Sequence, residues 1–153
     1  MDGESPTAAL VHRVLEIYDS QDYSHLDEVM HDDVVLSFLG VESSGIPVVT
    51  ERLEAIYAAI PDHFHRVEHI VVDERNTSAA VQMVVGGHHT AAPYPTSFGG
   101  VPASGKYVEW RPGSFIEARD GKVAKWTVYL DQVTLLQVLG VPLDPAALIP
   151  AEV

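Results

Sequence analysis

The chain has 153 residues, of which 46% are hydrophobic and 20% charged, as is typical of one globular domain covering residues 1–153. Its 22 acidic residues outnumber 9 basic ones, for a formal charge of −13. This balance argues against nucleic acid and anionic membrane surfaces as partners, because both attract clustered Lys and Arg. Cysteine is absent, which excludes disulfides, thiolate catalysis and cysteine-bound zinc.

The chain also lacks the sequence signals of export or membrane insertion. No apolar run approaches the roughly 20 residues that cross a bilayer. The first residues, Met1 to Pro6, are acidic and polar, unlike the basic and then apolar start of a signal peptide. We therefore expect a cytoplasmic protein.

The first part of the chain carries mainly helical patterns. Ser5-Pro6 suits a helix start, and Val14 and Ile17 belong to an apolar stripe at helical spacing. Thr50 is a candidate cap for a later helix, which Pro61 ends. The predicted elements are a helix at 5–19, a helix at 23–30, a strand at 34–39, a loop at 40–47 and a helix at 50–60.

The second part of the chain is typical of strands joined by tight turns. Asp120-Gly121 is a strong two-residue hairpin signal. Gly140 and Pro142 end a closing helix. The predicted elements are strands at 63–73, 78–90, 106–119 and 123–130, a long loop at 91–105 and a helix at 131–139. Helices gathered on one side of such a curved antiparallel sheet predict an α+β layer fold.

Strand alternation predicts which side chains face the interior. Within 106–119 one face is apolar, whereas the other carries Glu109, Arg111, Glu117 and Arg119. In the next strand, Lys125, Thr127 and Tyr129 share the second face. The predicted inward set is Val108, Trp110, Ser114, Ile116, Trp126, Val128 and Leu130. A mainly apolar internal pocket for a small organic molecule is therefore expected.

Several motifs of the second half occur in an order typical of a known family. Residues 98–106 read FGGVPASGK, which is similar to the loop G-x-P-x-[ST]-G-[KR] of SnoaL-like polyketide cyclases. The stretch from Asp120 through Trp126 to Gly140, and the strand end at 87–90, continue that pattern. The chain resembles this family along nearly its whole length, most strongly over 81–140. The resemblance implies the cone-shaped fold of the nuclear-transport-factor-2-like superfamily, in which helices close a pocket over a bent sheet.

The resemblance nominates Asp131 as a catalytic residue. In SnoaL-like aldol cyclases, an aspartate at the end of this strand acts as acid and base. An apolar pocket would raise the pKa of the carboxyl group, so that it could exchange a proton near neutrality. Strict alternation, however, puts Asp131 and Trp126 on opposite faces, and only a bulge would bring both inward. Asp131 could instead cap the closing helix, and both interpretations stay open.

The same cyclases use a histidine on the penultimate strand, where this chain has none. His88 and His89, at a strand end, are the available substitutes. Only one of them can point inward. His89 shares a face with Met83, so we predict His89 as a base or as a hydrogen-bond donor to a substrate carbonyl. A histidine at the solvent edge, or one that anchors the neighbouring loop, is the alternative.

Two other chemistries have little support. His63 and His65 are a weak metal pair without a third ligand nearby, so no metal is predicted. In the related limonene-type epoxide hydrolases, an aspartate follows the strand tryptophan by two residues. Val128 occupies that position here, and the partner Arg and Asp of the earlier strand are missing. The residues therefore argue against epoxide hydrolysis.

Aromatic side chains complete the predicted pocket. The loop at 91–105 is too long for a plain connection and is stiffened by prolines, so we expect it to form a lid that carries Tyr94 and Phe98. The predicted catalytic residues are Asp131, His89 and Tyr129. The predicted substrate-binding residues are Phe38, Tyr57, Met83, Tyr94, Phe98, Trp110, Ser114, Ile116, Trp126, Val128 and Leu130.

These observations and the resemblance together predict a cofactor-free cyclase of lyase or isomerase type in polyketide (antibiotic) biosynthesis. It would hold a hydrophobic linear precursor in a conformation ready for ring closure by cycloaddition, Michael or aldol chemistry. A hydrogen bond from His89, Tyr129 or Asp131 would polarise one carbonyl. The alternatives are an isomerase with Asp131 as proton shuttle and a non-catalytic binding domain with the same pocket. The resemblance also implies a homodimer formed through the outer face of the sheet.

Overall fold

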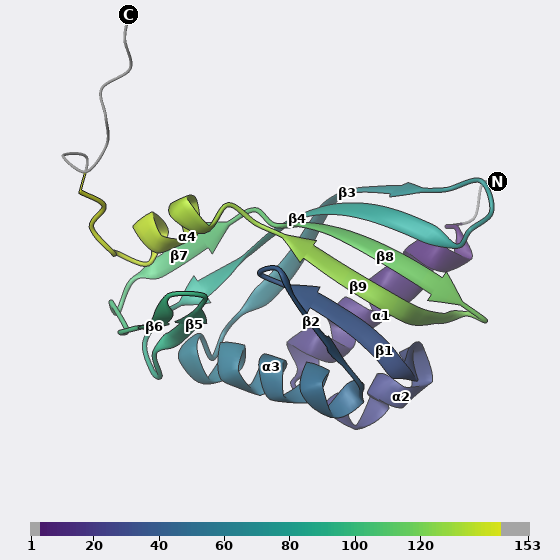
Figure 1. The fold of residues 1–153 in the computed structure, drawn as a ribbon, viewed down its shortest axis with the longest axis horizontal. Helices are drawn as coiled ribbons and strands as arrows, with labels where there is room; N and C mark the ends of the chain where they lie inside the picture. Colours follow the sequence, from purple (N-terminus) through teal and green to yellow (C-terminus); the bar gives the residue numbers. More distant parts are fainter. Residues whose placement is uncertain (1–3, 145–153) are drawn as a thin grey trace, which may run out of the picture.

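A computed structural model describes residues 4–144, in which four α-helices lie around a curved, open sheet (Figure 1). The predicted α+β fold is therefore confirmed. The predicted domain, 1–153, extends at both ends beyond the described residues. In chain order the elements are α1 (Pro6–Ser20), a 3-10 turn η1 (Tyr23–His25), α2 (Leu26–Val29), β1 (Met30–Phe38), β2 (Val41–Ser44), α3 (Ile46–Ala59), β3 (Phe64–Val72), β4 (Ser78–His88), β5 (Tyr94–Thr96), β6 (Gly99–Val101), β7 (Tyr107–Trp110), β8 (Gly113–Arg119), β9 (Lys122–Tyr129) and α4 (Gln132–Val138).

The main sheet has the strand order β2-β1-β9-β8-β4-β3, and β7 pairs with β4 in line with β8. The run β3-β4-β8-β9 is the expected antiparallel meander. The sheet is not antiparallel throughout, however, because β1 pairs with β9 in parallel, with Leu36 opposite Trp126. The all-antiparallel prediction was wrong at this pair, since apolar alternation marks a strand but carries no information about its direction.

Three local features were not predicted. The chain reverses after β1 through Leu39 and Gly40, both at positive φ, and the expected loop there forms β2. The long loop at 91–105 contains the β5–β6 hairpin. The predicted strand 106–119 is divided into β7 and β8 by the segment Arg111-Pro112, because proline has no N–H to donate to a neighbouring strand.

The N-termini of α1 and α3 follow from their local sequences. Ser5 caps α1 by accepting a hydrogen bond from the Ala8 N–H, and Pro6 begins the helix. Helix α3 begins at Ile46, four residues before the predicted cap at Thr50. Gly45 adopts a φ of 99°, and Pro47 pre-sets the first turn. An ordinary residue at Gly45 would be strained.

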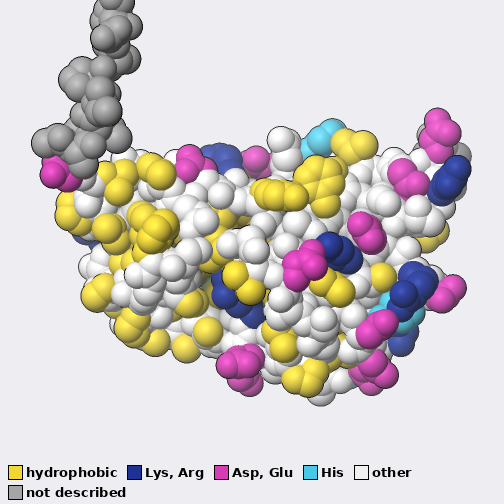
Figure 2. Space-filling model, in the orientation of Figure 1, with side chains coloured by type: hydrophobic (Ala, Val, Ile, Leu, Met, Phe, Trp, Pro, Cys, Tyr) yellow, Lys and Arg dark blue, Asp and Glu magenta, His cyan; other side chains and the backbone are white. Residues whose placement is uncertain are grey.

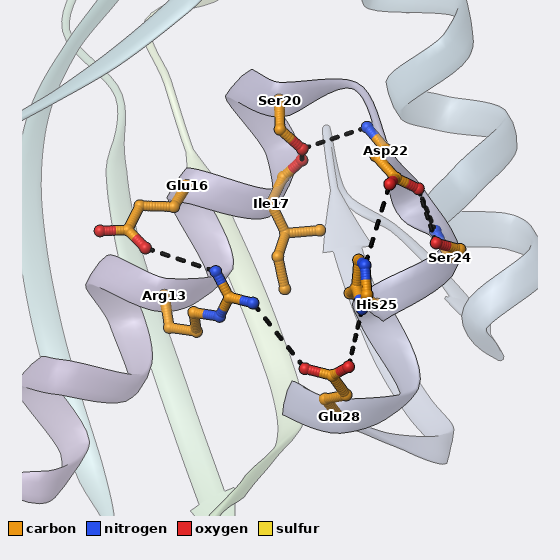
Figure 3. Close-up of polar contacts among 8 residues, drawn as sticks. All are labelled: Arg13, Glu16, Ile17, Ser20, Asp22, Ser24, His25 and Glu28. Carbon is orange, nitrogen blue, oxygen red and sulfur yellow. Dashed lines mark hydrogen bonds and ion pairs between the residues drawn. The ribbon is translucent and has the colours of Figure 1, made fainter.

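A surface network of polar contacts holds η1 and α2 against α1 (Figure 3). The carboxylate of Glu28 forms ion pairs with two residues: its Oε1 lies 2.7 Å from His25 Nδ1, and its Oε2 lies 3.8 Å from Arg13 Nη2. The hydrogen bond and charge of Glu28 raise the pKa of His25. Ser24 donates its N–H to Asp22, which caps the 3-10 turn. These solvent-exposed contacts stabilise the turn that follows Asp19.

The core lies between the helices and the concave face of the sheet. It includes Val11 and Val14 of α1, Leu53 of α3, and Val81 of β4. The convex face leaves other large side chains exposed, such as Phe115 and Tyr129. Acidic side chains are scattered over the face seen in Figure 2, and hydrophobic ones gather at its left end. Within residues 4–144 no helix has the length and apolarity needed to cross a membrane.

Candidate functional site

A pocket opens between the concave sheet face and helices α1 and α3. Its walls come from both helices and from β1, β3, β4, β8 and β9, with Tyr94 and Trp110 at one side. Its enclosed volume is about 80 Å³, and an adjoining groove adds about 250 Å³. Organic ligands commonly occupy ~300 Å³ or more. The pocket alone is smaller than this, and the pocket and the groove together reach about this size.

Most of the lining is apolar, and much of it comes from the residues that strand alternation nominated. Ser114 and Trp126 form a buried pair, in which the indole N–H donates to the Ser114 hydroxyl at 3.1 Å. The nominated residues that line the pocket are Phe38, Met83, Tyr94, Trp110, Ser114, Trp126, Val128 and Leu130. Their placement is as expected, and their role in substrate binding stays a prediction.

One wall of the pocket is polar, which the sequence reasoning did not foresee. His65 of β3 lies with its Nδ1 2.7 Å from Oδ1 of Asp19, in the last turn of α1. The backbone N–H of His65 donates to Oδ2 of Asp19 at 3.1 Å. The Tyr57 hydroxyl donates to Oδ1 at 2.7 Å. Three donors therefore hold this carboxylate at the edge of the pocket.

Electrostatics keep Asp19 ionised. Burial acts to raise the pKa of its carboxyl group, but the hydrogen bond and charge of His65, with the hydrogen bond from Tyr57, bring it below its usual value. The side chain of His65 is 13% exposed and lines the pocket. With Nδ1–H donated to the carboxylate, Nε2 is left with its lone pair available. This arrangement suits proton transfer to and from a bound molecule.

His63 lies beside His65, with ring centroids 4.9 Å apart, and also lines the pocket. Its ring packs against Tyr57 and Trp110. Burial, together with the neighbouring His65, lowers the pKa of His63 to about 3. Its Nδ1 is buried without a hydrogen-bond partner in the described chain. His63 is therefore a neutral imidazole at neutral pH.

Arg52 of α3 is the cation of the pocket. Its guanidinium carbon lies 3.6 Å from the centre of the Phe38 ring. Its Nε and Nη2 atoms are buried and have no hydrogen-bond partner within residues 4–144. Desolvation lowers the pKa of this group, yet a guanidinium stays protonated in proteins.

Asp131 lies outside the pocket and caps α4. Its Oδ1 accepts hydrogen bonds from the N–H groups of Val133 and Thr134, and Oδ2 accepts from the Thr134 hydroxyl. The Thr134 and Val133 donors lower the pKa of Asp131, where a pocket carboxyl would have a raised one. The position of Asp131 is therefore that of a helix cap, because no bulge turns its side chain into the pocket.

The other two nominated catalytic residues are also outside the lining. Tyr129 is 63% exposed on the convex face, where its ring packs on Phe115. Alternation from Trp126 already put it there. His89 is fully buried, and its Nε2 contacts the Ala92 carbonyl oxygen at 3.1 Å. Its position is that of the loop-anchoring alternative.

Three nominated substrate-binding residues do not line the pocket. Phe98 is 76% exposed at the tip of the β5–β6 hairpin. Of the two aromatic residues nominated in this loop, Tyr94 lines the pocket and Phe98 does not. Tyr57 donates a hydrogen bond to Asp19 at the edge of the pocket. Ile116 is buried in the core below it, as is Val108.

No group of three potential metal ligands is found within residues 4–144. Asp19 lies close to His65, and its carboxylate already accepts three hydrogen bonds.

Comparisons with known proteins agree with this architecture. The sequence matches the model of the SnoaL-like polyketide cyclase family over residues 8–139. The chain therefore belongs to the SnoaL-like polyketide cyclase family. No curated protein matches the sequence significantly.

Solved structures share the fold. A protein from Jannaschia sp. CCS1 superposes with a TM-score of 0.78 at 19% identity, covering 93% of this chain and 99% of that one. TsrD from Streptomyces laurentii gives 0.76 at 21%, covering 93% and 100%. A SnoaL-like polyketide cyclase from Agrobacterium tumefaciens C58 gives 0.69 at 20%, covering 90% and 100%. At these identities the likeness establishes the fold alone.

The polar groups of the pocket left weak signals in the sequence. Arg52 stands three residues after Val49 and four before Ile56, so it lies on the apolar face of α3, where a charge is unusual. His63 and His65 are two positions apart, a spacing that puts two side chains on one strand face, but this pattern alone indicated no more than a weak metal pair. Asp19 had no local signal, because its partner His65 lies 46 positions away in the chain.

Proposed function

We propose that this protein is a cyclase that closes a ring in a hydrophobic, polyketide-like linear precursor, with His65 as the acid–base residue. The observation that carries the proposal is the hydrogen bond between His65 Nδ1 and Asp19 Oδ1 at the wall of an apolar pocket. The family of the chain supports the class of reaction. Antibiotic biosynthesis is the setting that such a substrate implies.

The chemistry follows from the acidity of a carbon between two carbonyl groups. His65 Nε2 accepts a proton from that carbon, and Asp19 stabilises the imidazolium that forms. The resulting enolate carbon attacks a carbonyl carbon further along the chain, which forms the new C–C bond. The alkoxide oxygen then takes the proton back from Nε2. This aldol-type step balances without a cofactor.

The rest of the pocket supplies orientation. Trp110 and Trp126 are large, buried and rigid surfaces on which a flexible chain can be held in a bent conformation, and such positioning contributes several kcal/mol to catalysis. Neutral His63 lies beside His65 and can accept or donate a hydrogen bond without adding charge. A cycloaddition or Michael closure would rely on the same surfaces.

Activity on a linear poly-β-ketone, offered both as the free acid and as its methyl ester, tests the proposal. We expect His65→Gln to lower kcat about 10²–10⁴-fold. Asp19→Asn should lower kcat less, because Asp19 positions His65 and stabilises the imidazolium that forms. Asp131→Asn, outside the pocket, is the matched control and should keep activity. Full activity in both His65→Gln and Asp19→Asn would contradict the acid–base role of His65. It would mean that the pocket promotes ring closure only by holding the substrate in a bent conformation.

Two other functions use the same pocket. An isomerase would return the proton from His65 to a different carbon, giving a shifted double bond without a ring. A binding domain would hold its ligand unchanged. Product analysis separates the three, since only a cyclase gives a product isomeric with the precursor and one ring richer.

We also propose a homodimer formed through the convex sheet face. Phe115 of β8 and Tyr129 of β9 are exposed there. Val71 of β3 is also exposed, and it lies in the same row as Phe115, because both residues pair with Ala80 of β4. Light scattering on the purified protein measures the oligomeric state. Phe115→Glu should shift a dimer to monomer, whereas a monomeric parent protein would contradict the proposal.

A further inference from the structure

Arg52 occupies the boundary between the pocket and the adjoining groove. Arg52, Leu36 and Phe38 line both spaces, so these three side chains separate them. The guanidinium carbon lies over the Phe38 ring, 3.6 Å from its centre. Stacking of this kind occupies the face of the guanidinium and leaves the N–H groups at its edge free.

The two unpartnered atoms of Arg52 are Nε and Nη2. Their N–H bonds point along one edge of the planar group and are nearly parallel. This is the edge that pairs side-on with both oxygens of a carboxylate. Leaving buried charged donors unsatisfied is costly, so a ligand that satisfies both donors together would gain that free energy on binding.

The surroundings leave this edge to a ligand. The protein has a net charge of −13, yet no carboxylate forms an ion pair with Arg52 in residues 4–144. Glu51 also lines the groove, but its side chain is exposed. Asp19 is engaged with His65 and Tyr57, and Arg52 lies instead beside Phe38 and Tyr94.

We propose that Arg52 binds the carboxylate of a hydrophobic acid, so that the substrate enters the pocket as a free acid and not as a neutral ester or amide. The inference rests on the proposed function of the pocket as the substrate site. The carboxylate pairs with Nε and Nη2 in the space between pocket and groove, and the apolar chain extends into the pocket. Arg52 thereby sets which end of the substrate lies near His65.

The affinities of the protein for octanoate and for octanamide, measured by calorimetry, test the proposal. The two probes have nearly equal size, and only octanoate is charged. We expect octanoate to bind the parent protein about 10–100-fold more tightly than octanamide. Arg52→Met should remove that preference while octanamide binding changes less than about twofold. Arg52→Lys, which keeps the charge without the two-donor edge, should bind octanoate with intermediate affinity.

Arg111→Met is the matched control, because Arg111 is exposed and pairs with Glu68 away from the pocket. It removes the same charge and should leave both affinities unchanged. Equal binding of the two probes to the parent protein would overturn the inference while leaving the pocket as a site for apolar chains. Binding of neither probe would overturn the inference and the proposed substrate site together. An octanoate preference that survives in Arg52→Met, or is lost in Arg111→Met, would also overturn it.

Discussion

The indole N–H of Trp126 donates a hydrogen bond to the Ser114 hydroxyl, 3.1 Å away on the neighbouring strand. Both side chains are buried and line the pocket. Ser114→Ala leaves the indole N–H unpaired in apolar surroundings. We expect the free energy of unfolding, measured with urea, to fall by about 1–3 kcal/mol.

A double-mutant cycle controls for the packing of the two residues. In the Trp126→Phe background the indole N–H is already gone, so Ser114→Ala should cost clearly less than in the parent protein. Equal costs in both backgrounds would mean that the hydrogen bond contributes nothing measurable.

Asp131 contributes to stability as a helix cap. Asp131→Ala removes the acceptor for the Val133 and Thr134 N–H groups. We expect the midpoint of thermal unfolding to fall by roughly 2–4 °C, with ring-closing activity retained at lower temperature. Asp131→Ser keeps a capping oxygen and should recover most of the loss. Loss of activity in both variants at full stability would instead give Asp131 a catalytic role.

Burial of neutral His63 makes the protein sensitive to acid. The pKa of His63 is about 3 in the folded protein and about 6.5 in an unfolded chain. Between these values the unfolded chain binds a proton that the folded protein does not. Stability therefore falls as the pH is lowered from about 6.5 toward 3, with a slope of up to about 1.4 kcal/mol per pH unit from this group.

Unfolding free energies measured between pH 6.5 and 4.5 check this prediction. His63→Phe should flatten the dependence on pH, because the buried titratable group is gone. His69→Phe, at an exposed position of β3, the strand that begins directly after His63, is the control and should keep the slope of the parent protein. Identical slopes for the parent protein and His63→Phe would contradict the prediction.

Gly86 permits the close approach of β4 and β7. A Cβ atom at this position would overlap the carbonyl oxygen of Val108. Gly86→Ala should therefore lower the free energy of unfolding by about 1–3 kcal/mol or more. Gly113 has no atom within 4 Å of its Cβ position, so Gly113→Ala is the matched control and should change stability little. Comparable losses would mean that backbone freedom, and not the contact, decides the effect.

The sequence predicted the fold wherever a local pattern determines a local structure. Asp120 and Gly121 form the expected tight turn, at φ values of 52° and 76°, and the two tryptophans face inward because β-strands alternate. The parallel pairing of β1 with β9 was beyond such patterns, since strand direction depends on how the intervening chain returns. The short strands β5 and β6 lack any apolar alternation that could mark them.

The apolar wall of the pocket was predictable for the same reason, and its polar wall was not. Trp110 and Trp126 follow from strand parity. The contact between Asp19 and His65 depends on where α1 ends relative to β3, which is a consequence of packing the whole domain. The family resemblance pointed to Asp131, but the chain ends β9 without the bulge that would turn this residue inward.

The pairing of β1 with β9 governs when the pocket can exist. As the chain is synthesised, β1 ends at Phe38, 84 positions before β9 begins at Lys122. Until β9 is made, β1 can pair only with the short strand β2. Contacts between such distant segments slow folding and leave apolar strands exposed meanwhile. Any fragment that stops before Lys122 lacks Trp126, Val128 and Leu130. The pocket therefore cannot be complete until β9 has been synthesised and has paired with β1.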